Sequence, residues 1–385
     1  MKRTQSAVAF LPWVRVDEIH RVGGLRLIPY KRGLLPGDMQ GVRQRELDAV
    51  LSAYADRPRK RVERATLLEV GSWKSGQDAS RALPKLFRAR DFLCTSALAA
   101  RKLFHGHSGY CNAHHYELVV QAFNAGQAKS VAFTTRRRDG SSTVLWGANE
   151  FAFHRPLHVT SDQRAEFDAS LLRALMQIPV SEGWIHEAIV EFNAANTDSS
   201  DVPRHVEVVL MKSAFDWLLQ IDYRAKNFIK AIVRHLVPPG STPPTGPLTA
   251  RWLARPRKGG VLEAWAEEFC NLRNLSAHGG DRGPNFVWSR EAHLVFAATV
   301  FPLLLKKILA DRQWYALTDR DKLGISLLDR FVAFDPLKAT SRGHGTHPWL
   351  KISSDAQLRA ALERAWAERA GESASVGARV SDLEF

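Results

Sequence analysis

The sequence predicts an α+β N-terminal domain followed by an all-α helical bundle. Strand-like runs and a hairpin signal occur in the first part of the chain, and a polar run over residues 193–201 then marks a boundary. After that boundary, apolar residues recur at helical spacing. A chain of 385 residues is too long for one simple core and suits two domains. We therefore predict domains over residues 1–195 and 196–335, with a C-terminal extension over residues 336–385.

The first domain is predicted to contain several strands and two helices. The strand-like runs are LRLIPY (residues 25–30), TLLEV (66–70) and HYELVVQAF (115–123), which are rich in aliphatic and aromatic residues. Helices are predicted over residues 90–104 and 164–178. Ser161 or Asp162 offers a cap for the second of these helices.

A β-hairpin is predicted over residues 130–146, SVAFTTRRRDGSSTVLW, because an Asp-Gly turn signal lies between two β-rich arms. Its tip carries Arg136, Arg137 and Arg138. Strand residues alternate between faces, so two of the three should share a side, which suits a nucleic-acid phosphate backbone. An exposed arginine cluster also keeps sheet edges from pairing. Both interpretations remain open.

The second domain is predicted to be helical. Apolar spacing predicts one long helix over residues 202–237, ended by the proline-rich run PPGSTPPTGP. Further helices are predicted over residues 261–277, 290–310 and 321–334, and the short connections favour antiparallel neighbours in a four-helix bundle. The helix over 290–310 is apolar nearly all round, so we expect it to be buried.

The C-terminal extension is predicted to contain one amphipathic helix, over residues 354–370, which begins with a serine cap. The final residues, GESASVGARVSDLEF, are poor in large apolar side chains. We expect this tail to be disordered.

The net charge of +14 is concentrated in the first part of the chain. Residues 1–160 hold 26 Lys and Arg against 13 Asp and Glu, which leaves only one excess positive charge for the rest. A concentrated positive field attracts polyanions, most often nucleic acid. RNA is the expected partner, and the alternative is a charge that serves solubility alone.

The sequence points to a cytoplasmic protein without a membrane partner. The N-terminus, MKRTQSAVAFLPWV, makes a poor signal peptide because its apolar run is short and interrupted by Pro12. The longest apolar stretch, residues 294–305, falls short of the roughly 20 residues that span a bilayer. Three widely spaced cysteines, Cys94, Cys111 and Cys270, fit a reducing compartment.

The predicted helix over residues 261–277 carries two stripes when its residues are placed at 100° intervals. Its apolar face consists of Leu262, Trp265, Phe269, Leu272 and Ser276. The polar ridge on the opposite side consists of Glu267, Asn271, Asn274 and His278. Helix physics alone interprets this ridge as a solvent face that ends at a glycine C-cap.

The string RNLSAHG at the end of this helix resembles the R-x-x-x-x-H motif of HEPN domains. It is especially similar to the Apea-like form, in which arginine-asparagine and alanine-histidine-glycine recur together. The surroundings also resemble that family: a long preceding helix containing AFDWLLQI, a variable linker, and an apolar helix after the motif. The resemblance covers about residues 200–335, roughly a third of the chain.

This resemblance implies a metal-independent endoribonuclease without a cofactor, since many HEPN proteins have that activity. Cleavage by attack of the RNA 2'-hydroxyl needs a proton acceptor, a proton donor and positive charge near the phosphate. By resemblance, His278 is the general acid or base and Arg273 stabilises the transition state. Asn274 would orient His278 or the phosphate. Family members of this type often act as toxins or in defence against phage, with an inhibitory or sensing partner.

The spacing of the motif raises a geometric difficulty. Five helical residues turn 500°, which leaves Arg273 and His278 about 140° apart on a straight helix. A bent helix end would bring them together, and so would a second subunit that contributes its own copy of the motif. HEPN domains generally dimerise in this second way. We therefore expect a homodimer.

Two other functions remain open from the sequence. A HEPN domain can serve as a non-catalytic interaction or scaffold module, here joined to a nucleic-acid-binding N-terminal domain. A metal-dependent hydrolase built on the N-terminal half would use FHGHSGYCNAHH, whose candidate ligands are His105, His107, Cys111, His114 and His115. Their spacing matches no familiar zinc pattern, so we expect no metal. The sequence also lacks a phosphate-binding P-loop and a nucleophile elbow.

Overall fold

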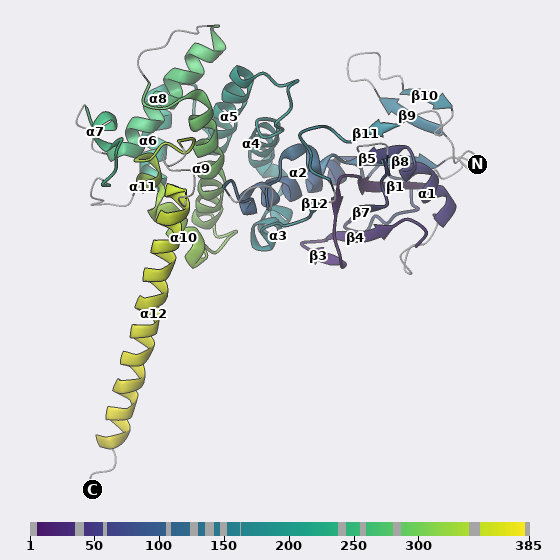
Figure 1. The fold of residues 1–385 in the computed structure, drawn as a ribbon. Coiled ribbons are helices and arrows are strands. Elements are labelled where there is room, and N and C mark those ends of the chain that lie inside the picture. Colours follow the sequence, from purple (N-terminus) through teal and green to yellow (C-terminus); the bar gives the residue numbers. More distant parts are fainter. Residues whose placement is uncertain are drawn as a thin grey trace. The chain divides into compact units, whose positions relative to one another are not determined.

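The computed structural model shows a strand-rich N-terminal region followed by a mostly helical C-terminal part, as the sequence predicts at this level of detail (Figure 1). The structure describes residues 6–34, 42–56, 60–104, 109–123, 130–134, 142–146, 152–161, 163–237, 244–254, 259–279, 286–338 and 347–381.

The chain divides into two compact units. The first is formed mainly by Met1–Asp222, and the second mainly by the residues from Tyr223 onward. Two short segments of the later chain, Ser276–Gly279 and Ile308–Tyr315, belong to the first unit.

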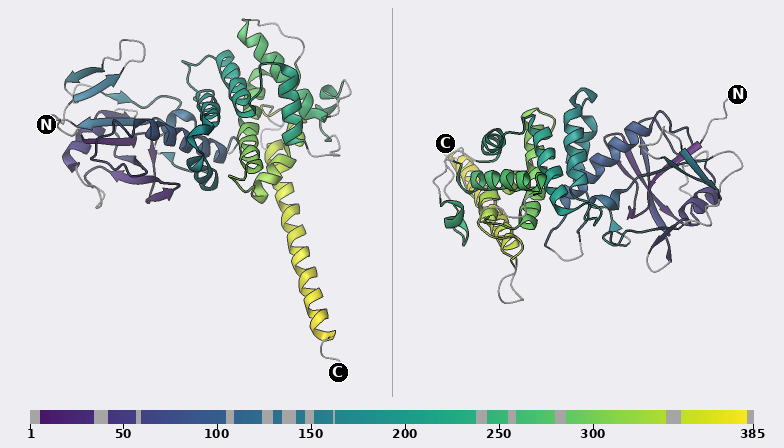
Figure 2. Two further views of the ribbon diagram at one scale, coloured as in Figure 1. Left: turned by 180° about the vertical axis from the view of Figure 1, so that it is seen from behind. Right: turned by 90° about the horizontal axis from the view of Figure 1, so that it is seen from above.

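The first unit is built on a five-stranded antiparallel sheet with the order β3-β4-β7-β1-β8, whose strands are labelled in Figure 1. Figure 2 shows the same strand-rich region in purple and blue from two further sides. The strands are β1 (Ser6–Leu11), β3 (His20–Val22), β4 (Leu25–Lys31), β7 (Arg64–Val70) and β8 (Val119–Phe123). The strands predicted over residues 25–30 and 66–70 are confirmed. The run over 115–123 is a strand only from Val119, because a 3-10 helix over Ala113–Tyr116 occupies its start.

Three smaller sheets complete the strand-rich region. β2 (Val14–Arg15) pairs in parallel with β12 (Gln163–Arg164). β5 (Tyr54–Asp56) lies between β11 (Phe153–His154) and β6 (Lys60–Arg61). The predicted hairpin is confirmed as β9 (Ser130–Thr134) and β10 (Ser142–Trp146), which pair antiparallel. Its tip, with Arg136, Arg137 and Arg138, lies outside the described residues.

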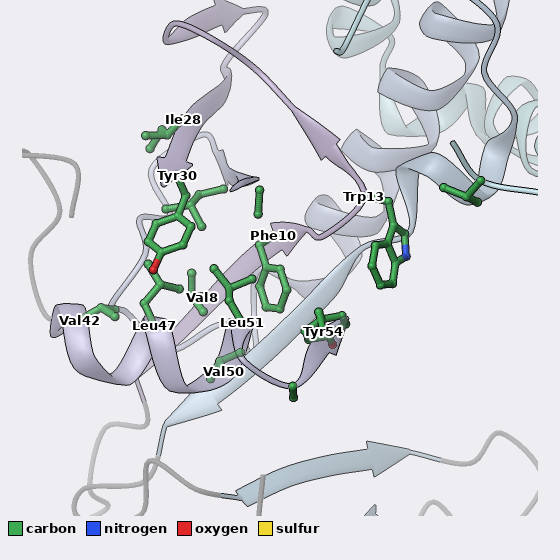
Figure 3. Close-up of a cluster of buried hydrophobic side chains, with 14 residues drawn as sticks. Val8, Phe10, Trp13, Ile28, Tyr30, Val42, Leu47, Val50, Leu51 and Tyr54 are labelled. Carbon is green, nitrogen blue, oxygen red and sulfur yellow. The ribbon is translucent and has the colours of Figure 1, made fainter. Parts of the chain in front are cut away.

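One face of the five-stranded sheet packs against helix α1 (Gln44–Leu51) through a cluster of buried side chains (Figure 3). Phe10 and Tyr30 of the sheet meet Leu47 and Leu51 of the helix there. All four are at most 2% exposed, and each large apolar side chain buried in this way contributes about 1.5–3 kcal/mol.

The first unit contains four further helices: α2 (Leu83–Ala100), α3 (Ala169–Gln177), α4 (Gly183–Ala194) and α5 (Arg204–Leu219). A 3-10 turn over Val180–Glu182 joins α3 to α4. The helix predicted over residues 90–104 begins earlier, at Leu83, and ends at Ala100. The helix predicted over 164–178 begins only at Ala169, because Gln163–Arg164 form β12. Its cap is Asp168, whose side chain accepts the Leu171 N–H.

The prediction of one long helix over residues 202–237 is wrong, because the structure has two helices there. α5 ends at Leu219, and α6 begins at Ala225 and ends at Leu236. Gln220 adopts a left-handed conformation with φ 51° and ψ 45°, which ends α5. Apolar periodicity continued through the break because both helices bury one face, so the pattern alone could not reveal it.

The described part of the second unit is helical. The predicted helices over 261–277 and 290–310 are confirmed as α8 (Gly260–Ala277) and α9 (Arg290–Asp311). The helix predicted over 321–334 is two, α10 (Asp319–Ser326) and α11 (Leu328–Val332). A single turn, α7 (Thr249–Trp252), was not predicted.

The C-terminal extension forms one long helix, α12 (Pro348–Ser381). It begins before the predicted residue 354 and continues through residues 371–381, which the sequence predicts as part of a disordered tail. Alanine, glutamate and arginine dominate the middle of α12, and these residues have high helix propensity.

α9 is the one helix in the described residues that is long and apolar enough to cross a membrane. Most of its apolar stretch is buried inside the structure, where Phe296, Phe301 and Leu304 are fully enclosed. This burial is typical of a core helix, as the sequence predicts.

Candidate functional site

The motif-bearing helix α8 presents the apolar face that the sequence predicts. Its predicted members are all at most 6% exposed: Leu262, Trp265, Phe269, Leu272 and Ser276. The indole of Trp265 stacks on the ring of Phe269, with 5.4 Å between centroids and 12° between planes. This packing fixes the rotation of α8 and determines which residues remain at the surface.

The predicted polar ridge of α8 is also confirmed. Asn271, Asn274 and His278 are exposed, and Glu267 is half-buried. Arg273 is half-buried beside the ridge. Core packing therefore does not occupy the side chains of Asn274 and His278, which remain available for contacts outside the chain.

Two of the three predicted catalytic residues interact directly. Nη1 of Arg273 donates a hydrogen bond to Oδ1 of Asn274 at 3.2 Å. This contact leaves the amide nitrogen of Asn274 and the other guanidinium donors of Arg273 directed elsewhere. The neighbouring side chains thus offer several hydrogen-bond donors next to each other, as an anion-binding site requires.

His278 follows the last helical residue, Ala277, in a turn. Gly279 adopts φ 70°, the left-handed conformation of a helix C-cap, which glycine takes without steric cost. α8 is regular through Ala277, so any departure from helical geometry begins at His278 itself.

The carboxylate of Glu268 ties α8 to the beginning of α9. It accepts the backbone N–H of Val287 at 2.9 Å and that of Trp288 at 3.1 Å. It also lies 3.0 Å from Nε2 of His293, a ring that is 0% exposed. Three donors on one carboxylate hold the start of α9 against the helix that bears the motif.

Aromatic rings surround His293 on several sides. Trp288 lies edge-on at 5.7 Å and Phe269 stacks at 6.0 Å between centroids. Trp252 approaches at 6.5 Å. His293 is consequently a structural histidine of the second unit, inaccessible to a substrate.

The Cys/His segment forms a hydrogen-bonded network in the first unit. The N–H of Asn112 donates to Nδ1 of His115 at 3.1 Å, and Nε2 of His115 lies 2.9 Å from Oγ1 of Thr160. Nδ1 of His114 lies 2.7 Å from Nε2 of His158. The N–H of Asn112 and Oγ1 of Thr160 thus occupy both ring nitrogens of His115, which leaves neither of them to bind a metal.

Burial decides the ionisation of this network. Desolvation lowers the pKa of His115 to about 4, so the ring is neutral at pH 7. The pKa of His114 is also lowered, mainly by burial and to a smaller extent by the neighbouring His158 ring. Cys111 is free and buried, which raises the pKa of its thiol to about 11. A buried neutral thiol is neither a good nucleophile nor a ready metal ligand.

Within the described residues, no group of three or more His, Cys, Asp or Glu side chains is arranged to hold a metal ion. Of the predicted candidate ligands, His105 and His107 lie outside those residues.

Sequence reasoning missed Glu268, His293 and His158. The sequence held a signal for two of them: Glu268 is a charged residue next to the apolar stripe of α8, and His293 is a histidine inside the apolar helix α9. Buried polar residues need partners, so either residue predicts the other. His158 lies in a loop 44 residues from His114, and no local pattern joins the two.

A scan against protein-family models found no match for this chain, and searches of curated proteins and of solved structures also found none.

Proposed function

We propose that this protein is a metal-independent endoribonuclease of HEPN type. The observation that supports the proposal best is the end of α8, where Arg273 donates to Asn274 and the exposed His278 follows. The opposite face of the same helix is buried by Trp265 and Phe269. Asn274 and His278 therefore lie on the face of α8 that is directed away from the core, and Arg273 lies half-buried beside that face.

The proposed reaction is an attack of the RNA 2'-hydroxyl on the adjacent phosphorus. The hydroxyl loses its proton to a general base, the P–O bond to the 5'-oxygen breaks, and that oxygen takes a proton from a general acid. His278 serves one of these roles, since its exposed imidazole can either accept or donate a proton. Arg273 binds the phosphate oxygens. Asn274 orients the Arg273 guanidinium, from which it accepts the 3.2 Å hydrogen bond. The products are a 2',3'-cyclic phosphate and a 5'-hydroxyl.

The proposal assigns RNA binding to the first unit. Nearly all the excess positive charge of the chain lies in residues 1–160, and a phosphate backbone is attracted to such a field. The hairpin tip with Arg136, Arg137 and Arg138 remains our predicted contact. This tip lies outside the described residues.

We further propose that the active form is a homodimer. On a straight helix, Arg273 and His278 would point about 140° apart, and α8 is regular up to Ala277. A second copy of the motif would supply the missing group, so that Arg273 of one subunit acts with His278 of its partner. By analogy with HEPN effectors, the protein would act in the cytoplasm as a toxin or in defence against phage, restrained by an inhibitory or sensing partner.

The decisive experiment incubates the purified full-length protein with labelled single-stranded RNA in the presence of EDTA. The wild type should cleave and leave 2',3'-cyclic phosphate ends. His278→Ala should reduce the rate by about 10²–10⁴-fold through loss of the proton carrier. Arg273→Ala should reduce it by about 10²–10³-fold through loss of transition-state charge.

Asn271→Ala is the matched control, because Asn271 is an exposed amide on the same ridge, one turn earlier. It should keep full activity. Cleavage that persists in both motif variants would overturn the proposal. RNA that is bound with a steep salt dependence but never shortened would favour the scaffold function. Activity abolished by EDTA would favour the metal-dependent hydrolase.

A further inference from the structure

A cavity of about 400 Å³ opens in the first unit. Short strands and their connections form its walls: β2, the end of β5, β6, the start of β7 and the segment after β11. The lining residues are Pro12, Trp13, Val14, Arg15, Asp56, Lys60, Arg61, Val62, Glu63, Arg64, Arg155 and Ser161. Its size falls within the roughly 300–1,000 Å³ of small-molecule sites.

The lining of this cavity is strongly basic. The lining contains five basic residues and two acidic ones, and one of the acidic residues, Asp56, is already paired with Arg155. Lys60, Arg61 and Arg64 are exposed and form no ion pair within the described residues. Three such cations on one short stretch of chain repel one another, so a multiply charged anion at the cavity would be stabilised.

Another part of the lining is apolar and well packed. Trp13 is 5% exposed, and its indole N–H donates to Oε2 of Glu117 at 3.0 Å. Its ring packs edge-on against Tyr54 at 5.7 Å, in the core cluster of the sheet (Figure 3). Pro12 and Val14 flank it. A preformed wall of this kind costs little ordering entropy when a ligand binds.

Arg155 is also fixed in advance. Its guanidinium donates to the carboxylate of Asp56 and to the carbonyl oxygen of Val159. An arginine held by two partners keeps its orientation and offers its remaining donors to a ligand. The cavity thus combines exposed cations with a cation held by two partners and with buried apolar residues.

We propose that this cavity binds a nucleotide. The phosphates lie against Lys60, Arg61 and Arg64, and the base lies against the wall that contains Trp13. The ligand is either a free nucleotide or the phosphorylated terminal nucleotide of an RNA chain, which share this chemistry. This site is independent of Arg273 and His278, and it goes beyond the nuclease function by giving the first unit a ligand of its own.

The test is calorimetric titration of the full-length protein with ATP, AMP, adenosine and inorganic phosphate. ATP should bind more tightly than AMP, and both more tightly than adenosine or phosphate alone. Arg61→Ala and Arg64→Ala should each weaken ATP binding by about tenfold, because each removes a charge-assisted contact. Arg21→Ala is the control, since Arg21 is an exposed arginine of β3 outside the cavity lining.

RNA oligonucleotides with and without a 5'-phosphate distinguish the two sources of the ligand. Displacement of ATP by the phosphorylated oligonucleotide alone assigns the site to an RNA end, and binding of ATP without such displacement assigns it to a free nucleotide. The proposal would be overturned if ATP did not bind, or if adenosine bound as tightly as ATP. It would also be overturned if Arg61→Ala and Arg64→Ala bound ATP as tightly as the wild type. His278→Ala should bind ATP like wild type, so failure of the nuclease proposal leaves this result intact.

Discussion

Glu268 of α8 and His293 of α9 form a buried pair, with 3.0 Å between Oε1 and Nε2. The carboxylate side chain is 13% exposed and the imidazole is fully enclosed. A carboxylate oxygen that already accepts backbone N–H groups is an acceptor for the imidazole as well, so Nε2 of His293 is the donor of this pair. The same carboxylate accepts the N–H groups of Val287 and Trp288, which makes Glu268 the junction between α8 and the start of α9.

Removing the carboxylate should destabilise the second unit. Glu268→Ala leaves three donors without their acceptor, and each group that stays buried and unsatisfied costs about 1–3 kcal/mol. We expect the free energy of unfolding to fall by about 3 kcal/mol, with some donors reaching water. Urea denaturation followed by tryptophan fluorescence measures this loss.

Two variants serve as controls for this prediction. Glu268→Gln keeps an acceptor oxygen and should lose about 1 kcal/mol, the value of a weakened hydrogen bond. Asn271→Ala changes an exposed amide on the same helix and should leave the urea midpoint nearly unchanged. A Glu268→Ala protein as stable as wild type would show that the junction carries no net stabilisation.

The left-handed residue between α5 and α6 offers a stabilising change. Gln220 has φ 51°, a conformation that costs a residue with a Cβ atom about 1–2 kcal/mol. Gln220→Gly relieves this cost but loosens the unfolded chain, so we expect a net gain of about 0.5–1 kcal/mol. Gln220→Ala keeps the Cβ atom and should bring no gain. Thermal unfolding of the three proteins checks the order, and equal stability of the glycine and alanine variants would contradict it.

The contrast between α8 and the α5–α6 break shows what the sequence could predict. The faces of α8 followed from residue spacing, because one buried stripe on a regular helix is a local property. The break at Gln220 did not, since it depends on a backbone conformation that periodicity does not record. The pairing of His114 with His158 and of Asp56 with Arg155 joins residues 44 and 99 positions apart. Such pairs arise from the folding of the sheets, so the basic cavity could not be predicted either.

His115 should make the protein less stable in acid. Its native pKa of about 4 lies below the ordinary value of about 6.5, so the unfolded chain binds a proton that the native chain refuses. The stability that the neutral His115 ring contributes is fully present above pH 6.5 and is lost as the pH falls toward 4. Protonation of Nδ1 would also break the hydrogen bond from the N–H of Asn112. The total loss from this residue is about 3 kcal/mol.

Urea denaturation between pH 7 and pH 4 tests this prediction, with His115→Gln as the comparison. The variant should show a smaller loss of stability with falling pH than wild type. An NMR titration of the His115 ring in the wild-type protein gives the same information without a substitution. A ring that titrates near pH 6.5 would contradict the prediction.

The proposed sharing of the active site between subunits predicts rescue of two inactive variants by each other. If Arg273 of one subunit acts with His278 of its partner, a mixed dimer of Arg273→Ala and His278→Ala contains one site with both wild-type side chains. Random reassortment makes half of the dimers mixed, so the mixture should recover about a quarter of the wild-type rate. If each site uses both residues of one chain, every site in the mixture is defective and no activity returns. Rates are measured after the variants are mixed, unfolded together and refolded, with separately refolded samples as the control.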